Sequence, residues 1–402
     1  MAIAPTAEEV PALRPPRDAP GRALLRARAY YFFFFGAIGC YALYINLYFA
    51  ARGLNGAAIG LLAALPPAML VIGGPVWGAL ADRFRLHQTL LPLVTFAPVL
   101  PILRLGQTGE PAEMLLLVGA ASFFSMAAGP LIDSAVLDLV AGTRHTFGSV
   151  RVWGTLGFIV ASLGMGALLP VGLDYRAYGP IFVGYAVGMA AAGAAALGLP
   201  ARRRALSGGF GAGLRELLRQ PAFALFLPAA FLVGAATQAA FSFYPLHLQQ
   251  LGATAALIGL AGSVSAVSEI PSLFYARALL HRLSAWGASA LGVAGYAARW
   301  LLVALARDPA AATATQVLQG LSFGPWLVGG VAYVDARTPP GLSATAQAVF
   351  TATQWGLGAA IGAAAGGWAY EHLGAAGFFV AASGVNVAGL SLILAASRYN
   401  RG

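Results

Sequence analysis

Two ionisable residues, Glu269 and Arg299, lie in the interior of long apolar stretches of this 402-residue sequence. An ionisable side chain inside a membrane-spanning helix costs about 2.5–3.5 kcal/mol on insertion scales, so each such residue marks a candidate site. Because consecutive helices are often neighbours, we expect the two side chains to pair near a central cavity. Glu269 would then carry a proton, or Arg299 would receive a substrate carboxylate, which guanidinium geometry suits. A purely structural ion pair is the alternative.

Uncharged polar and aromatic side chains recur at helical spacing in other stretches and predict further parts of this cavity. The candidates are Asn46, Tyr44, Gln316, Gln319, Gln238 and Trp355. Aromatic stripes also arise from packing alone, which is the alternative for each member. A cavity with aromatic walls and one arginine would suit an aromatic or otherwise apolar carboxylic acid.

A second set of opposite charges, Asp133 and Arg151, lies closer to the ends of two consecutive apolar stretches. The two residues come at similar depth, so their side chains could pair across neighbouring helices. We expect a structural or gating role for this pair rather than contact with a substrate.

The composition shows which elements must position these residues. Hydrophobic residues make up 59% of the chain and charged residues only 9%, whereas a soluble globular domain carries about 25% charged residues. The chain must therefore lie mostly inside a lipid bilayer. Strand-period alternation is absent from the sequence, so helices rather than a β-barrel are expected to satisfy the backbone.

Breaks in hydropathy divide the chain into apolar segments long enough to cross a hydrocarbon core of ~30 Å as helices. Twelve segments result, at roughly 27–50, 56–80, 86–106, 112–138, 148–170, 177–199, 222–246, 254–280, 284–306, 310–334, 342–369 and 374–397. The predicted fold is an all-α membrane protein with twelve transmembrane helices.

The basic residues, all arginines, are distributed unequally between the two sides of this map. Nineteen fall on the side of the N-terminus and only Arg52, Arg104, Arg176 and Arg307 fall on the other. By the positive-inside rule both termini are cytoplasmic and the protein is a multi-pass protein of the inner (plasma) membrane. The net charge of +10 is thus a topology signal, and no nucleic-acid partner is needed to explain it.

A polar, glycine-containing stretch near the middle of the chain divides the twelve segments into two halves. A shift of 199 residues lays Gly53, Ala57 and Gly60 of the first half on Gly252, Ala256 and Gly259 of the second. The predicted domains are a disordered cytoplasmic tail (1–26), two six-helix halves (27–199 and 222–397), a cytoplasmic linker (200–221) and a cytoplasmic C-terminus (398–402).

Motifs for enzymatic or metal chemistry are missing from the sequence. The five histidines are scattered at segment ends without metal-ligand spacing, and there is no zinc-protease helix motif or nucleophile-elbow serine. The sequence therefore predicts no enzyme, no metal site and no cofactor other than a proton gradient.

The run Gly78-Ala79-Leu80-Ala81-Asp82-Arg83 resembles the loop between the second and third helices of the major facilitator superfamily. In that family the Asp and Arg of this loop tie neighbouring helices together and gate the transport cycle. The resemblance implies a gating role for Gly78, Asp82 and Arg83, and two parallel six-helix halves.

Two further patterns narrow the resemblance. The runs Gly129-Pro130-Leu131-Ile132-Asp133 and Gly148 to Phe158 (GSVRVWGTLGF), with Glu269-Ile270-Pro271, are similar to the phenylpropionate permease branch of the superfamily, a relative of the lactose permease-type proton symporters. The resemblance implies a monomeric secondary transporter that takes up a small, aromatic carboxylate together with protons. Proton-antiport efflux of amphipathic compounds and a transport-dead membrane sensor are the alternatives.

Overall fold

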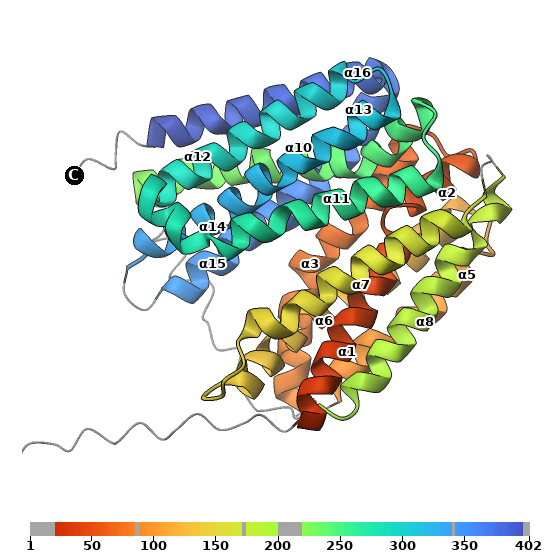
Figure 1. The fold of residues 1–402 in the computed structure, drawn as a ribbon, viewed down its shortest axis with the longest axis horizontal. Coiled ribbons are helices and arrows are strands. Elements are labelled where there is room, and N and C mark those ends of the chain that lie inside the picture. Colours follow the sequence, from red (N-terminus) through yellow and green to blue (C-terminus); the bar gives the residue numbers. More distant parts are fainter. Residues whose placement is uncertain (1–20, 85–88, 171–173, 200–218, 340–341, 397–402) are drawn as a thin grey trace, which may run out of the picture.

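The computed structural model describes residues 21–84, 89–170, 174–199, 219–339 and 342–396, and these fold almost entirely into helices (Figure 1). Glycine, alanine and leucine dominate the helices, and a helix pairs the backbone N–H and C=O groups of its interior with one another, as a bilayer requires. Bends divide several of the membrane-crossing segments into shorter helices.

The first half of the chain contains eight helices and one 3₁₀ turn in its described residues. They are α1 (Gly21–Tyr41), α2 (Ile45–Ala51), α3 (Gly56–Phe84), α4 (Leu90–Phe96), α5 (Val99–Leu105), α6 (Pro111–Val140), α7 (Phe147–Leu168), η2 (Tyr175–Tyr178) and α8 (Gly179–Ala196). α1 with α2, and α4 with α5, each form one bent crossing. Pro98 caps α5, where a residue without a backbone N–H interrupts the helical ladder.

The second half has a similar set of elements. They are α10 (Pro221–Gln250), α11 (Ala255–Phe274), α12 (Ala276–Leu305), α13 (Pro309–Ala314), the 3₁₀ turn η3 (Thr315–Leu318), α14 (Gln319–Ala336), α15 (Ser343–Thr351), the π-helical turn η4 (Ala352–Gly358) and α16 (Ala359–Ala396). α12 is broken at Ser284 and α16 at Gly374, where φ is positive.

The predicted twelve-helix architecture is confirmed. Ten segments of the described chain are long and apolar enough to cross a membrane, judged by length and composition. The last of them, Thr345–Ala396, holds 52 residues and bends at Gly374, so it makes two crossings. The shorter apolar segment Leu90–Leu105 completes the set.

The predicted N-terminal tail is too long. α1 begins at Gly21, inside the segment 1–26, because Ala23 and Leu24 are buried and Arg26 donates from Nη1 to the carbonyl of Gly198 at 3.0 Å. The rest of that segment and most of the predicted linker lie outside the described residues.

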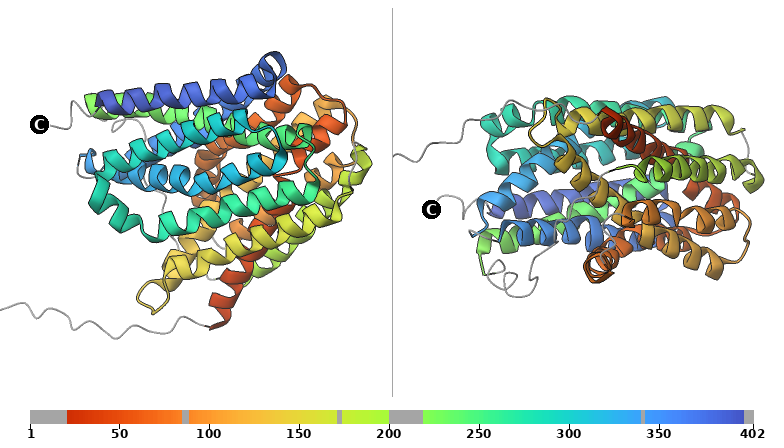
Figure 2. Two further views of the ribbon diagram at one scale, coloured as in Figure 1. Left: turned by 45° about the horizontal axis from the view of Figure 1, so that its top comes forward. Right: turned by 90° about the horizontal axis from the view of Figure 1, so that it is seen from below.

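The two halves meet along two pairs of helices, α7 with α11 and α3 with α16. In Figures 1 and 2 they converge at the end that carries α2, α5 and α13. They diverge toward the end where α1 begins and α16 ends. We call the converging end the closed end.

Glycine allows the helices to touch at the closed end. A Cβ on Gly60 of α3 would lie 2.6 Å from the carbonyl oxygen of Ala363 and 2.8 Å from Cα of Gly367. A Cβ on Gly259 of α11 would lie 2.4 Å from the carbonyl oxygen of Ser162 on α7. Real Cβ atoms do not approach backbone so closely, so any side chain here forces the two halves apart.

Replacing Gly60 with leucine is therefore expected to prevent closure and favour a conformation open at this end. The check is the distance between spin labels on cysteines at Asn55 and His372, both exposed, in a chain whose sole cysteine, Cys40, is changed to serine. The label distance should lengthen in Gly60→Leu. Gly74→Leu on the same helix is the control, because a Cβ there meets nothing within 4 Å; equal distances in both variants would contradict the expectation.

Candidate functional site

A cavity of about 320 Å³ lies between the two halves. Its walls come from α1, α7, α10, α11, η3 and α14, so both halves contribute. The lining residues are Phe35, Ile38, Leu43, Arg151, Thr155, Phe158, Phe241, Tyr244, Pro245, Ile258, Gly262, Ser265, Ala266, Glu269, Gln316 and Gln319. Of the residues predicted from the sequence, Glu269, Gln316, Gln319 and Arg151 reach this cavity.

Arg151 is the arginine among the lining residues and comes from the first half. Its guanidinium carbon lies 3.9 Å from the centre of the Phe35 ring and 5.3 Å from that of Tyr31. A guanidinium stacked on aromatic rings keeps the N–H groups at its edge free to point elsewhere. Arg151 thus joins an apolar, aromatic wall to a positive charge.

Glu269 and Arg299 do not pair directly; the amide of Gln319 lies between them. Gln319 donates from Nε2 to Oε1 of Glu269 at 2.7 Å, and its Oε1 accepts from Nη1 of Arg299. The second guanidinium nitrogen of Arg299, Nη2, donates to Oε1 of Gln316. The expected direct pair is therefore replaced by a chain of three polar side chains, Glu269–Gln319–Arg299.

Arg299 lies behind the cavity wall and not in it. Its side chain is 0% exposed, and the rings of Phe241 and Trp300 cover its guanidinium at 5.0 and 4.4 Å. In this conformation Nη1 and Nη2 of Arg299 donate to the two glutamines, and the predicted role of Arg299 in receiving a substrate carboxylate stays a prediction from the sequence. Arg151 is the arginine that lines this cavity.

The 3₁₀ turn η3 explains why two glutamines meet one arginine. Residues three apart eclipse one another in a 3₁₀ helix, and Gln316 and Gln319 follow this spacing across the junction of η3 and α14. The backbone N–H of Gly320 donates to Oγ of Ser268 at 3.1 Å, and Ser268 lies next to Glu269 on α11. A Cβ on Gly320 would lie only 2.0 Å from the carbonyl oxygen of Ser268, so this glycine permits the contact that sets Gln319 beside Glu269.

The orientation of both amides is dictated by Arg299. A guanidinium has only donors, so each glutamine must turn its oxygen toward Arg299 and its NH₂ group away. A flipped amide would leave buried N–H groups facing N–H groups, at a cost of about 1–3 kcal/mol for each unsatisfied group. Gln316 and Gln319 are 1% and 3% exposed, so water cannot offset this cost.

Asp133 and Arg151 are likewise separated by one residue, Tyr31 of α1. The hydroxyl of Tyr31 donates to Oδ1 of Asp133 at 2.5 Å, and the ring of the same tyrosine lies under the guanidinium of Arg151. The expected link between α6 and α7 thus runs through a third helix. Tyr31 was missed by sequence reasoning because it stands in a run of aromatic residues, Tyr30 to Phe35, in which nothing distinguishes it.

The remaining predicted cavity residues do not line the cavity. Tyr44 and Asn46 lie at the closed end, where the halves meet. The hydroxyl of Tyr44 lies 2.8 Å from the carbonyl oxygen of Ser162 in its own half and 3.3 Å from that of Ala255 in the second half, and Asn46 donates to the carbonyl of Ser242 in the second half at 2.7 Å. Gln238 donates to Oγ of Ser242 at 3.4 Å. Trp355 packs against a phenylalanine of α14, Phe323, with ring centres 6.0 Å apart.

The motif residues near the end of α3 are only partly described. The side chains of Gly78 and Asp82 lie outside the described residues, and Arg83 is exposed. Their gating role stays a prediction from the sequence.

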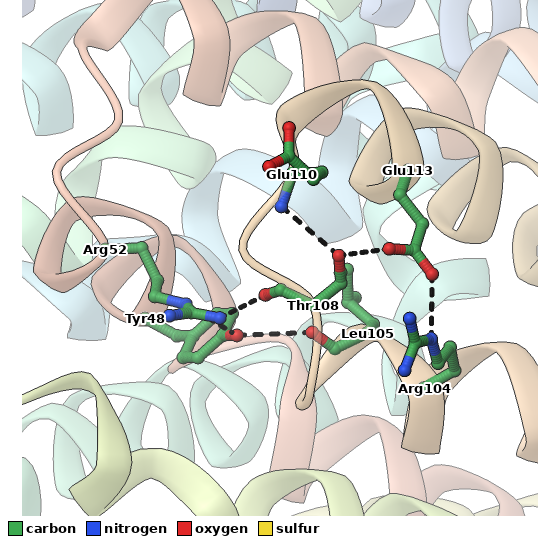
Figure 3. A network of polar contacts seen from close by, with 7 residues as sticks. All are labelled: Tyr48, Arg52, Arg104, Leu105, Thr108, Glu110 and Glu113. Carbon is green, nitrogen blue, oxygen red and sulfur yellow. Dashed lines mark hydrogen bonds and ion pairs between the residues drawn. The ribbon is translucent and has the colours of Figure 1, made fainter.

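A separate polar network lies at the closed end of the first half (Figure 3). Arg104 donates from Nε to Oε1 of Glu113 at 2.7 Å, and Thr108 donates to the other oxygen of the same carboxylate. Arg52 donates to the carbonyl of Thr108. These contacts tie α2, α5 and α6 together away from the cavity, so we assign them to structure.

The fold and the charged cavity between two six-helix halves define a class of protein, the secondary transporters. Residues 24–381 match the family described as MFS_1 like, and the chain therefore belongs to this family of the major facilitator superfamily. It is a multi-pass membrane transporter and not an enzyme.

Two curated relatives span nearly the whole chain. The maltose permease of Geobacillus stearothermophilus is 30% identical over 376 residues, which cover 92% of this chain and 94% of the relative. The protein named "Probable 3-phenylpropionic acid transporter" of Escherichia coli is 25% identical over 364 residues, covering 88% and 92%.

Solved structures agree on the fold. The crystal structure of the nucleoside transporter NupG superposes with a TM-score of 0.83 at 20% identity, covering 94% of this chain and 99% of that one. A bacterial homologue of the lysosomal transporter Spinster gives a TM-score of 0.71 at 17% identity, covering 96% of this chain and 97% of that one.

Proposed function

We propose that this transporter imports a small aromatic carboxylate together with protons. The observation that carries the proposal is the placement of Arg151 and Glu269 on opposite halves of one cavity with aromatic walls. Arg151 would hold the carboxylate, the rings of Phe158, Phe241 and Tyr244 would surround the apolar part, and Glu269 would carry the proton. The proposal includes a monomer in the inner membrane with both termini cytoplasmic.

The charges around the cavity support coupling to one proton. Among the described residues, Arg151 and Glu269 line the cavity, and Arg299 and Asp133 each approach one of them through a single intervening side chain. With all four ionised, their formal charges cancel. A carboxylate that enters adds one negative charge, and protonation of Glu269 would restore neutrality in an environment where net charge is costly.

The test is the pH outside proteoliposomes after addition of 3-phenylpropionate. Import with protons makes the outside alkaline; protein-free vesicles measure the passive entry of the neutral acid and are subtracted. Acidification would show antiport, as the efflux alternative requires. No response above the protein-free background for any carboxylate would overturn the proposal.

A neutral polyhydroxylated solute is the second candidate. The amides of Gln316 and Gln319 suit hydroxyl groups, and the maltose permease is among the relatives. The two candidates differ in charge movement, because a carboxylate with one proton carries no net charge whereas a neutral solute with one proton carries one. An imposed membrane potential should therefore leave the rate of carboxylate uptake unchanged, and a rate that rises with inside-negative potential would favour the neutral solute.

A further inference from the structure

The two amides of the cavity wall have a fixed polarity. Arg299 accepts no hydrogen bond, and its Nη1 and Nη2 donate to the oxygens of Gln319 and Gln316. The NH₂ groups of both glutamines therefore face away from Arg299. Nε2 of Gln319 reaches Glu269 at 2.7 Å, and Nε2 of Gln316 reaches Oγ1 of Thr315 at 3.2 Å.

Both glutamines line the cavity while Arg299 does not. The rings of Phe241 and Trp300 cover its guanidinium at 5.0 and 4.4 Å. Among the described residues, none of its hydrogen-bond partners is a carboxylate, so no direct ion pair neutralises its charge. Because each NH₂ group has two hydrogens and one is used in these contacts, the second hydrogen of each is what this wall can offer to a ligand, with a buried positive charge behind it.

We propose that Arg299 is a specificity-determining positioning residue that selects ligands rich in hydrogen-bond acceptors by locking the Gln316 and Gln319 amides with their N–H groups toward the cavity. The inference rests on the proposed transport of a carboxylate. It adds the two glutamines to Arg151 as groups that distinguish a carboxylate from an equally shaped neutral group. A carboxylate has acceptors only, and a carboxamide brings its own N–H groups, which an N–H wall cannot accept. The carboxamide should bind more weakly because its N–H groups would face the N–H groups of the two glutamines, and buried donors that face one another lose their hydrogen bonds.

The test compares the affinities of the purified protein for 3-phenylpropionate and 3-phenylpropionamide, measured by calorimetry. The wild type should prefer the acid. Arg299→Lys keeps the charge but replaces the two-pronged guanidinium by a single ammonium, so at least one amide is free to turn. We expect the preference for the acid to fall about tenfold, the effect of one lost pairing.

Gln316→Glu provides a second variant in which Arg299 stays satisfied, because a carboxylate accepts from Nη2 as the amide oxygen does. This variant presents acceptors to the cavity in place of donors, and the preference for the acid should fall here also. If Arg299→Lys keeps the wild-type preference, Arg299 acts through charge alone and the inference is overturned. If both ligands weaken equally, the role is structural and the inference is also overturned.

Failure of the proposed function gives a different result. A wild type that binds the amide as tightly as the acid, or that binds neither, overturns the carboxylate proposal and the inference with it. A wild type that prefers the acid, with variants that share this preference, overturns the inference alone.

Discussion

Arg151→Gln is expected to weaken the binding of 3-phenylpropionate about ten- to a hundredfold, the range for loss of a hydrogen bond to a charged group. Arg151 is the arginine that lines the cavity, together with the aromatic residues that would surround the ring of the ligand, and its guanidinium stacks on Phe35. The glutamine keeps a polar side chain on α7, but it lacks the positive charge and the two parallel N–H groups with which a guanidinium binds both oxygens of a carboxylate. Titration calorimetry on the purified protein measures the change.

The methyl ester of the same acid separates charge recognition from packing. Its affinity should be the same in the wild type and in Arg151→Gln, because the ester has no charge for Arg151 to hold. Arg176→Gln is the matched control: this arginine is in the same half, is exposed, and lies at the closed end. Equal losses for acid and ester would assign Arg151 to packing against Phe35, and undiminished binding of the acid would remove it from the site.

The fold could be predicted from the sequence because each membrane crossing is a local property of apolar length. The break at Pro98 between α4 and α5 was not predicted, although a residue without a backbone N–H accounts for it. The break at Ser284 falls at the start of the predicted segment 284–306, whereas the 3₁₀ turn η3 and the π-helical turn that contains Trp355 were not predicted. They depend on contacts between helices, for which a single sequence gives no period or motif.

The sequence predicted several of the residues that form the candidate site, but not which of their side chains contact one another. The sequence predicted that Glu269 and Arg299 lie close enough in depth for their long side chains to meet, since rise per residue fixes depth along a helix. Which groups touch depends on rotation about the helix axis, and the 3₁₀ turn η3 inserted Gln319 between them. Arg151 was assigned to a pair with Asp133 because its depth was read from the helix end, whereas its long side chain reaches the cavity.

The tyrosines of the first crossing show the same limit. Tyr41, Tyr44 and Tyr48 recur at helical spacing, which predicts a shared face, but the sequence cannot say which neighbour each tyrosine meets. Tyr41 and Tyr48 pack on Tyr185 and Phe182 of α8, with ring centres 5.2 and 4.9 Å apart. These two tyrosines therefore hold the first crossing against α8, and that crossing lines the cavity through Phe35, Ile38 and Leu43 instead.

Glu269→Gln is expected to abolish uphill accumulation of the substrate while exchange of substrate across the membrane continues. If Glu269 carries the proton, an amide at this position cannot titrate, so the proton gradient no longer drives transport and the inside-to-outside ratio of substrate falls to about one. The amide oxygen can still accept from Nε2 of Gln319, so the chain to Arg299 persists and the site should still bind. Accumulation is measured in vesicles with an imposed pH gradient, and exchange in vesicles loaded with unlabelled substrate.

Glu113→Gln is the matched control, because it removes a carboxylate that lies outside the cavity. Glu113 is also a carboxylate within an apolar segment, but it serves the network of Arg104 and Thr108 at the closed end and does not line the cavity (Figure 3). Its replacement should leave the accumulation ratio unchanged, because no proton of the cycle passes through it. Accumulation that survives in Glu269→Gln would exclude Glu269 as the proton carrier, and loss of both accumulation and exchange would mean that Glu269 is needed to build the site rather than to drive it.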